Sequence, residues 1–271
     1  MMPGLMLLVV LLASFLPAGA AQDDPKTAAR TELNAGVQAF RQANYEEAVG
    51  HFEQAVALDP EFVTAHLYLA TAYAQTFVPG VDTPENVVWA TKALNQYREV
   101  LQLKPSDIIS LKGIAYLEIQ LKNFDQAKES YQKAIAADPS DPELFYSVGV
   151  ADWMMAYRAI AAEKAKLPAK SQGTLFLSAG CADARTAVQA NVNDGLAMLT
   201  KAVSLREDYD DAMAYMNLLY REKADRECDE LEQRAADLKI ADEWVDKTMA
   251  AKKAKAEKQA GPQGITMDQA K

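Results

Sequence analysis

A recurring turn sequence divides this chain at nearly regular intervals. Leu-Asp-Pro, Leu-Lys-Pro and Ala-Asp-Pro end at Pro60, Pro105 and Pro139, and Leu205-Arg206-Glu207 holds an equivalent position further on. The last residues of these turns are 45, 34 and 68 residues apart. A period of 34 residues survives if eleven residues are inserted in the first interval and if the third spans two periods. Self-similarity at such a period indicates a chain built from repeated structural units.

The stretch that ends at Pro139 shows the unit without insertions. Residues 108–121 and 124–137 are amphipathic, and polar Lys122-Asn123 separates them, so the unit is expected to be a pair of helices joined by a turn. Small, aromatic and terminating residues recur within it at Ala115, Ala127, Tyr131, Ala134 and Pro139. By these residues it resembles the tetratricopeptide repeat (TPR) family. The resemblance implies an all-α, right-handed superhelical solenoid of about five helix pairs, with helical insertions in units 2, 4 and 5.

The other units follow the same pattern with longer connections. In the second unit the turn is lengthened by eleven residues, and Thr83-Pro84-Glu85 predicts a helix start, because Thr favours the N-cap and Pro the first helical position. The fourth unit is expected to hold a long helix from Pro142 to about Lys166, a loop over residues 171–180 and a long return helix to about Val203. A hidden extra repeat is the alternative, but Pro168 would then lie inside a helix, at a cost of about 3 kcal/mol.

These units set the expected boundaries of the chain. The solenoid is expected over residues 29–249, after a polar linker at 21–28 and before a disordered, Lys- and Ala-rich tail at 250–271. At the N-terminus, an apolar run from Leu5 to Leu16 is followed by Pro17 and by Ala18-Gly19-Ala20, which is typical of a signal peptide over residues 1–20. Export to the periplasm or secretion is therefore expected; an uncleaved anchor is the alternative.

Charge and residue types narrow the function classes. The net charge of −10 at pH 7 argues against a nucleic-acid partner, because phosphate binding requires clustered Lys and Arg. The chain has two histidines, His51 and His66, and neither stands in a metal-ligand spacing. It also lacks a glycine-rich phosphate loop and a nucleophile elbow. No enzyme activity, cofactor or metal is expected.

Cys181 and Cys228 are the two cysteines of the chain. Both lie in lengthened connections of neighbouring units, which are expected at the same edge of the solenoid. An exported protein can form disulfides, so a Cys181–Cys228 bond is one hypothesis and two free thiols the other.

The resemblance also indicates where a partner would bind. In TPR domains the first helices of successive repeats line a concave groove, at positions four and three residues apart. Carried onto this chain, those positions are Leu33, Val37 and Phe40; Leu67, Thr71 and Ala74; Lys112, Tyr116 and Ile119; Tyr146, Val150 and Trp153; and Ala214, Leu218 and Arg221. This lining is mostly apolar and aromatic. It predicts a non-catalytic scaffold that holds a protein or peptide segment.

The first helix of the fourth unit leaves one question open. It is apolar nearly all round, so every side must be covered. Either the insertion at residues 158–193 folds over it, which would suit a structural or self-associating solenoid, or its exposed face takes a partner. Asp152 within this helix is expected to pair with Arg158 or Arg185. An enzyme with an unrecognised site is a third, less favoured class.

Overall fold

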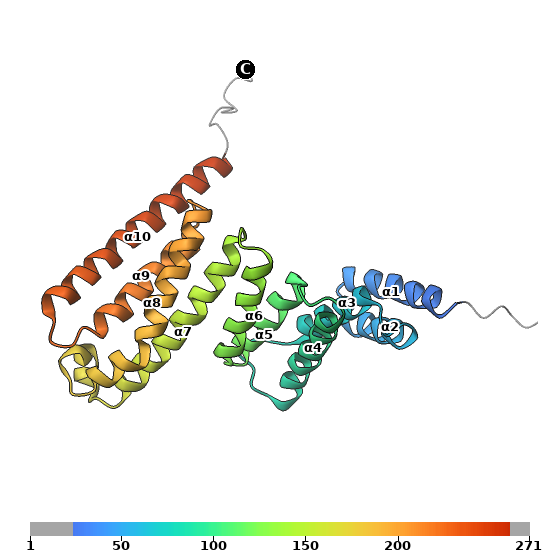
Figure 1. Cartoon of the computed structure of the whole chain (residues 1–271), viewed down its shortest axis with the longest axis horizontal. Helices are drawn as coiled ribbons and strands as arrows, with labels where there is room; N and C mark the ends of the chain where they lie inside the picture. The colour runs from blue at the N-terminus through green and yellow to red at the C-terminus, as the bar shows by residue number, and fades with distance from the viewer. Residues whose placement is uncertain (1–23, 261–271) are drawn as a thin grey trace, which may run out of the picture.

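The computed structural model describes residues 24–260, and every regular element in this part of the chain is a helix. The helices follow one another in antiparallel pairs along a curved array (Figure 1). In chain order they are α1 (Pro25–Arg41), α2 (Tyr45–Leu58), α3 (Val63–Thr76), α4 (Pro84–Leu103), α5 (Ile108–Gln120), α6 (Phe124–Ala137), α7 (Pro142–Ala165), the 3-10 helix η1 (Ala169–Leu177), α8 (Cys181–Leu205), α9 (Asp210–Asp225) and α10 (Leu231–Ala260).

Each helix packs on the next one in the chain, and alternate helices touch on one side. Thus α1 contacts α3, α3 contacts α5, and α7 contacts α9. The buried side chains form three successive clusters, the first spanning α1 to α5, the second α5 to α7 and the third α7 to α9. Partly buried residues such as Leu101 and Ile135 pack against two clusters each. This arrangement is a TPR-type solenoid, so the predicted fold class is confirmed.

Glycines allow the helices to cross closely at equivalent places. A Cβ atom on Gly36 would lie 2.5 Å from Cε1 of Phe52, and one on Gly113 would lie 2.5 Å from Cζ of Tyr97. Such distances are shorter than side chains tolerate, so each aromatic ring occupies the space left by the missing side chain.

The turns within units also repeat. Ala43 between α1 and α2 has φ 61°, and Lys122 between α5 and α6 has φ 66°. In both turns the following amide donates to a carbonyl of the preceding helix, from Asn44 to Ala39 (3.0 Å) and from Asn123 to Glu118 (2.7 Å). This is the hydrogen bonding that ends a helix at a left-handed residue.

Helix starts follow the sequence signals. Oγ1 of Thr83 accepts a hydrogen bond from the amide of Asn86 (3.3 Å), which caps α4 at the expected residue. Asn86 itself is buried and organises the lengthened turn before α4. Its side chain accepts from the amide of Val78 (2.8 Å) and donates to the carbonyls of Val78 and Val81 (2.8 and 2.7 Å).

Three boundaries differ from the sequence expectations. The first helix begins at Pro25, inside the expected linker, because Pro at the first helical position can open the helix there. The loop expected after Pro168 is largely the 3-10 helix η1. The tail expected from Ala250 is helical to Ala260, because its Ala, Lys, Glu and Gln residues are good helix formers. These residues carry no apolar period, so the sequence pattern did not indicate a helix.

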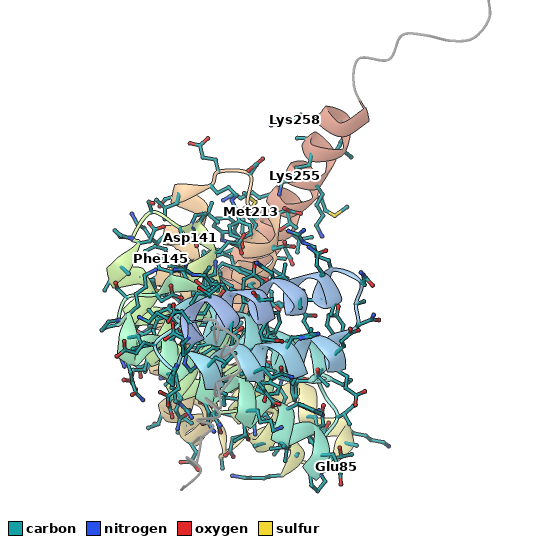
Figure 2. The ribbon with its side chains drawn as sticks, turned by 90° about the vertical axis from the view of Figure 1, so that its right-hand side faces the viewer. Glu85, Asp141, Phe145, Met213, Lys255 and Lys258 are labelled. Atoms are coloured by element: carbon teal, nitrogen blue, oxygen red, sulfur yellow. A yellow bond between two sulfur atoms is a disulfide. The ribbon has the colours of Figure 1, made fainter. Side chains whose placement is uncertain are left out.

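The final turns of α10 extend past the helices beside them. Figure 2 shows Lys255 and Lys258 on this projecting end. The Lys255 ammonium forms an ion pair with Asp210 at the start of α9, which lowers the pKa of that carboxyl. The expected signal peptide at residues 1–20 and the rest of the tail lie outside the described residues. Among residues 24–260, no helix has both the length and the apolar character needed to cross a membrane.

Candidate functional site: the aromatic face of α7 and α9

Four aromatic side chains gather where α7 and α9 lie side by side. Tyr146, Trp153 and Tyr157 are spaced seven and four residues apart on α7, which puts them on one side of the helix. The ring centroid of Tyr215 on α9 lies 5.7 Å from that of Tyr146 and 5.2 Å from that of Trp153, with both pairs edge to face. Trp153 also stacks on Tyr157 at 5.4 Å. We call Tyr146, Trp153, Tyr157 and Tyr215 the aromatic face.

The aromatic face is partly open to solvent. Tyr157 is 51% exposed, and the other three side chains are half-buried. The insertion at residues 158–193 leaves the Tyr157 ring exposed, but its return helix α8 packs along another side of α7. Insertion residues such as Ile160 and Leu175 belong to the core cluster against which Tyr146, Trp153 and Tyr215 pack, and η1 packs against α7, α8 and α9. The insertion therefore covers part of the apolar helix, and partner binding on the part that stays accessible remains a prediction.

The opposite side of α7 explains why the aromatic side chains point outward. A Cβ atom on Gly149 would lie 2.5 Å from Cγ of Leu199 and 3.3 Å from the carbonyl oxygen of Gly195. The two glycines let α7 and α8 approach closely, so this side of α7 is buried. The stripe of Tyr146, Val150, Trp153 and Tyr157 is then left on the side shared with α9.

Asp152 fixes the rotation of α7 from the buried side. Its side chain is 0% exposed, and Oδ1 accepts from Nζ of Lys128 on α6 (2.6 Å) and from the side-chain amide of Asn191 on α8 (3.1 Å). Burial raises the pKa of this carboxyl, whereas the hydrogen bonds from Lys128 and Asn191 lower it. One side chain therefore ties α7 to two neighbouring helices.

The predicted partners of Asp152 were wrong. Arg158 lies over the ring of Phe124, with 5.2 Å from Cζ to the centroid, and Arg185 donates to the carbonyl of Arg226. The ion-pair partner of Asp152 is Lys128 instead.

The N-terminal end of the aromatic face is held by a polar network. The hydroxyl of Tyr209 donates to Oε2 of Glu143 (2.6 Å), and Nη1 of Arg206 donates to Oε1 of the same carboxylate (2.9 Å). Tyr209 packs against Tyr146, with 5.1 Å between the ring centroids. Burial is the main cause of a raised pKa at both phenols, so both keep their protons near neutral pH.

Toward its C-terminal end, the aromatic face meets a buried carboxyl on α9. Glu222 is 8% exposed. Burial raises its pKa to about 7; Lys164 and Trp153 oppose this effect, and Asp225 adds to it. Nε1 of Trp153 is buried beside this carboxyl and has no hydrogen bond of good geometry. Lys164 is held by Asp225, at 2.5 Å. The surroundings of Glu222 were not anticipated from the sequence.

The groove positions predicted in units 1 to 3 are mostly engaged in contacts within the protein. Val37, Phe40 and Leu67 are half-buried against the first core cluster, and Ile119 packs against the second. The Thr71 hydroxyl donates to the carbonyl of Leu67 (2.8 Å).

Two side chains of unit 3 behave differently from each other. Lys112 donates to Asp141 at the start of α7 (3.1 Å), so its charge is paired. Tyr116 is 44% exposed. Of the predicted positions in the first three units, Tyr116 therefore offers the largest accessible aromatic surface, and partner binding by this set stays a prediction.

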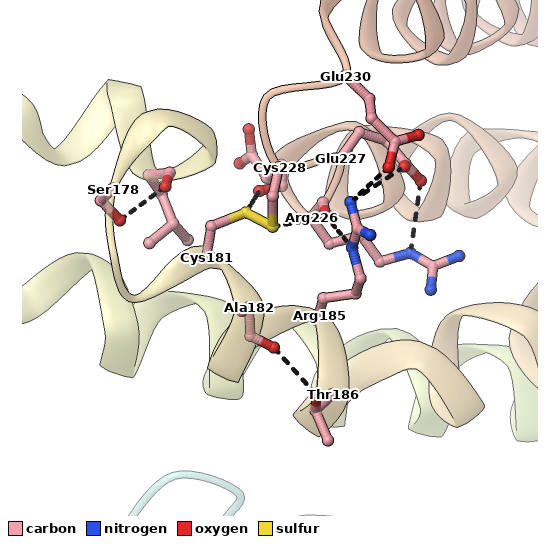
Figure 3. Close-up of a disulfide and its surroundings, with 11 residues drawn as sticks. Ser178, Cys181, Ala182, Arg185, Thr186, Arg226, Glu227, Cys228 and Glu230 are labelled. Atoms are coloured by element: carbon pink, nitrogen blue, oxygen red, sulfur yellow. Dashed lines mark hydrogen bonds and ion pairs between the residues drawn. A yellow bond between two sulfur atoms is a disulfide. The ribbon is translucent and has the colours of Figure 1, made fainter.

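A disulfide joins the insertion to the fifth unit. Cys181 at the start of α8 is bonded to Cys228 in the connection between α9 and α10, with Cα atoms 5.7 Å apart (Figure 3). Around it, Nε of Arg185 donates to the carbonyl of Arg226 (2.9 Å), and Nη2 donates to Glu230 (3.1 Å). The amide of Asp229 donates to the carbonyl of Phe176 in η1 (3.1 Å). These contacts hold the insertion against the end of unit 5.

The histidines take structural positions. His51 contacts the carboxylate of Glu32 (2.7 Å), and buried His66 is bonded through its two ring nitrogens to Gln96 (2.7 Å) and to the carbonyl of Pro60 (2.9 Å). Within residues 24–260, no group of three or more His, Cys, Asp or Glu side chains is arranged to hold a metal ion.

Comparison with known families identifies the repeating unit. A family model described as TPR repeat matches residues 38–76, and one described as tetratricopeptide repeat matches residues 113–141. The chain contains TPR repeats. The first matched segment contains the turn that ends at Pro60, and the second contains the turn that ends at Pro139.

Relatives and solved structures agree with this assignment. Hsp70-Hsp90 organizing protein 3 of Arabidopsis thaliana is 28% identical over 125 residues, which is 46% of this chain and 20% of that protein. The chain thus matches about a fifth of that relative's length.

Two solved TPR structures are similar along most of the chain. The crystal structure of the MamA protein superimposes with a TM-score of 0.58 at 11% identity, covering 88% of this chain and 98% of MamA. YrrB, described as a TPR protein with an unusual peptide-binding site, gives a TM-score of 0.54 at 15% identity, covering 88% of this chain and all of YrrB. At these identities the similarity concerns the fold.

Proposed function

We propose that this protein is a non-catalytic scaffold of the cell envelope that binds a segment of a partner protein on the concave side of its TPR array. The observation that carries the proposal is the exposed aromatic face of α7 and α9. Aromatic side chains that are accessible in the free protein and can be desolvated by a partner contribute strongly to binding. TPR proteins generally mediate protein–protein interactions, and YrrB is described as having a peptide-binding site, which is consistent with this assignment.

Binding on the aromatic face can be tested with variants that leave the fold intact. The partner would be captured from envelope extracts with the mature protein, identified by mass spectrometry and purified for titration. Tyr157→Ala removes a largely exposed ring, so we expect little change in stability and at least about tenfold weaker binding.

Val88→Ala is the matched control, because Val88 is 50% exposed on α4, away from the aromatic face. It should bind as the wild type does. Equal affinity of wild type and Tyr157→Ala for the purified partner would contradict the proposed site.

The envelope location is part of the same proposal. It is supported by the signal-like N-terminal sequence and by the disulfide between Cys181 and Cys228, a bond that persists in oxidising compartments. Fractionation of cells, followed by mass spectrometry of the unreduced protein, should find a chain that starts near Ala21 and has no alkylatable thiol. A cytosolic chain with an intact N-terminus and two free thiols would refute the location.

A self-associating solenoid is the second candidate function. Leu231 (59% exposed) and Met249 (62% exposed) lie on α10, the last helix of the array, where a further unit of a solenoid would stack. Light scattering of the purified protein distinguishes the two, since a scaffold that acts alone should stay monomeric at micromolar concentration.

A further inference from the structure

The charges beside the aromatic face are unequally neutralised. Basic side chains there, among them Lys112, Lys164 and Arg206, are each paired with a carboxylate, from Asp141, Asp225 and Glu143 respectively. Two further acidic side chains, Asp211 and Glu222, form no ion pair within residues 24–260. Asp211 acts electrostatically on Tyr146 and Tyr215, and Glu222 lies beside Trp153. The uncompensated charge of this surface is therefore negative.

We propose that the partner segment carries a Lys or Arg side chain that lies against Trp153 and Tyr157 and places its charge on the Glu222 carboxylate. The inference rests on the proposed function and assigns the chemistry of the ligand at that site. It concerns a cationic, otherwise apolar protein segment.

The aromatic rings suit the stem and the charge of such a side chain. Trp153 and Tyr157 stack with 5.4 Å between their ring centroids and 29° between their planes, so the two rings lie next to each other on α7. A Lys or Arg head near an aromatic face is attracted by the ring quadrupole, most strongly for Trp. The aliphatic stem can lie along apolar surface while the head reaches a polar group.

A pocket lies next to this surface. It has a volume of about 290 Å³ and is lined by Tyr157, Ile160, Ala161, Lys164 and Ala165 of α7 and by Gln172 of η1. Tyr157 belongs to the aromatic face, and Lys164, which acts electrostatically on Glu222, lines the same pocket. The pocket gives an incoming side chain room beside the Tyr157 ring.

Glu222 forms no ion pair among residues 24–260, and burial outweighs the effects of Lys164 and Trp153, the two groups that lower its pKa. A buried carboxylate whose charge is not balanced by a close cation is destabilised relative to its protonated form. An incoming cation would favour the ionised form, so binding would release the Glu222 proton. The charged groups that face this position are Lys164 from α7 and Asp225 on α9, and Arg234 from α10 lies 3.7 Å from Asp225. Both cations are engaged with Asp225, which leaves Glu222 available.

A selection from a displayed library of random dodecapeptides tests the inference without knowledge of the partner. The mature wild-type protein should enrich peptides rich in apolar residues together with Lys or Arg. Glu222→Gln should still enrich apolar residues but not basic ones, and a selected basic peptide should bind it about tenfold or more weakly. Replacing the basic residue of that peptide by Gln should weaken binding to the wild type but not to Glu222→Gln.

The matched control is Glu207→Gln, which removes the same charge at an exposed position in the turn before α9. It should select as the wild type does. Enrichment of apolar peptides without basic residues by the wild type would overturn this inference and leave the proposed function standing. No enrichment over the bare matrix by the wild type would overturn both. Equal loss of basic peptides with Glu207→Gln would assign the effect to overall charge and overturn the Glu222 site.

Discussion

At the scale of single residues, two buried carboxyls differ in their interaction partners. Asp152 has a Lys128 ammonium at 2.6 Å and an amide donor from Asn191, whereas Glu222 has no ion pair among residues 24–260. The first arrangement orients a helix. The second leaves an ionisable group whose state depends on pH and on what binds beside it.

The raised pKa of Glu222 should appear as pH-dependent stability. Its pKa is about 7 in the folded protein and near 4.5 when unfolded, so the native state binds the extra proton between these values. Stability from this group is complete below pH 4.5 and is lost as the pH rises through 7. Relative to Glu222→Gln, the wild type should lose about 3 kcal/mol between pH 4.5 and pH 8.

Urea unfolding at several pH values measures this difference. Glu207→Gln, which removes a carboxylate at an exposed position, is the matched control for this measurement. Parallel stability curves for wild type and Glu222→Gln would contradict the buried, ionisable role of Glu222.

The left-handed turn residues give a second prediction at this scale. Ala43 has φ 61°, where a Cβ atom costs about 1 kcal/mol and glycine has no such penalty. Ala43→Gly should therefore stabilise the protein by about 0.5–1 kcal/mol. Ala197→Gly, at an exposed position inside α8, should destabilise it by about 1 kcal/mol. Thermal unfolding measures the stability of both variants. A shift of the melting temperature in the same direction for both would refute the argument.

The residue-scale predictions from sequence failed where a contact came from another helix. Arg158 was expected to reach Asp152, but six positions along a helix turn a side chain to a different side. The actual partner, Lys128, lies 24 residues earlier, and Asn191 lies 39 residues later. Neither separation leaves a local pattern in the sequence. Thr83, in contrast, caps α4 through a bond to Asn86 only three residues away, and this helix start was predicted.

At the scale of elements, the crossing of α7 and α8 decides what α7 displays. Gly149 and Gly195 bring the two helices together, and the aromatic stripe is left on the other side. The long helix from Pro142 and its return were expected, because Pro142 starts a helix and Pro168 follows its end. The side of the solenoid on which the insertion lies was not predicted, because it depends on contacts such as that between Arg185 and the Arg226 carbonyl.

A methyl group at this crossing should separate the two helices. A Cβ on Gly149 would lie 2.5 Å from Leu199, so Gly149→Ala should destabilise the protein by about 1–3 kcal/mol. Gly50→Ala is the control, because nothing lies within 4 Å of its Cβ position on α2 and alanine is the better helix former. It should stabilise by about 0.5–1 kcal/mol, and denaturant unfolding compares the two. If Gly149→Ala left the free energy of unfolding unchanged, the crossing would be loosely packed.

At the scale of the whole molecule, stability should be distributed unit by unit. Helices contact their neighbours along the chain, so a defect at one end should not spread to the other. The 34-residue period made this architecture predictable. The extension of α10 to Ala260 was missed because exposed helix formers carry no apolar period.

Hydrogen exchange can test this distribution. Gly36→Val places a side chain where Phe52 packs, so amide protection should fall in α1 and α2 by at least about tenfold. Protection in α9 and α10 should stay unchanged. Uniform loss of protection along the chain would indicate one cooperative unit instead of a nearest-neighbour array.

The disulfide between Cys181 and Cys228 has a mechanical consequence. If the two ends of the molecule were pulled apart, tension would pass through the bond and bypass the chain between the two cysteines, which are separated by 47 residues. The helices outside the bridged segment, α1 to α7, η1 and α10, would carry the load and unfold, while α8 and α9 would bear no tension. A fully stretched oxidised molecule would be shorter than a reduced one by about 150 Å, since an extended residue spans about 3.3 Å.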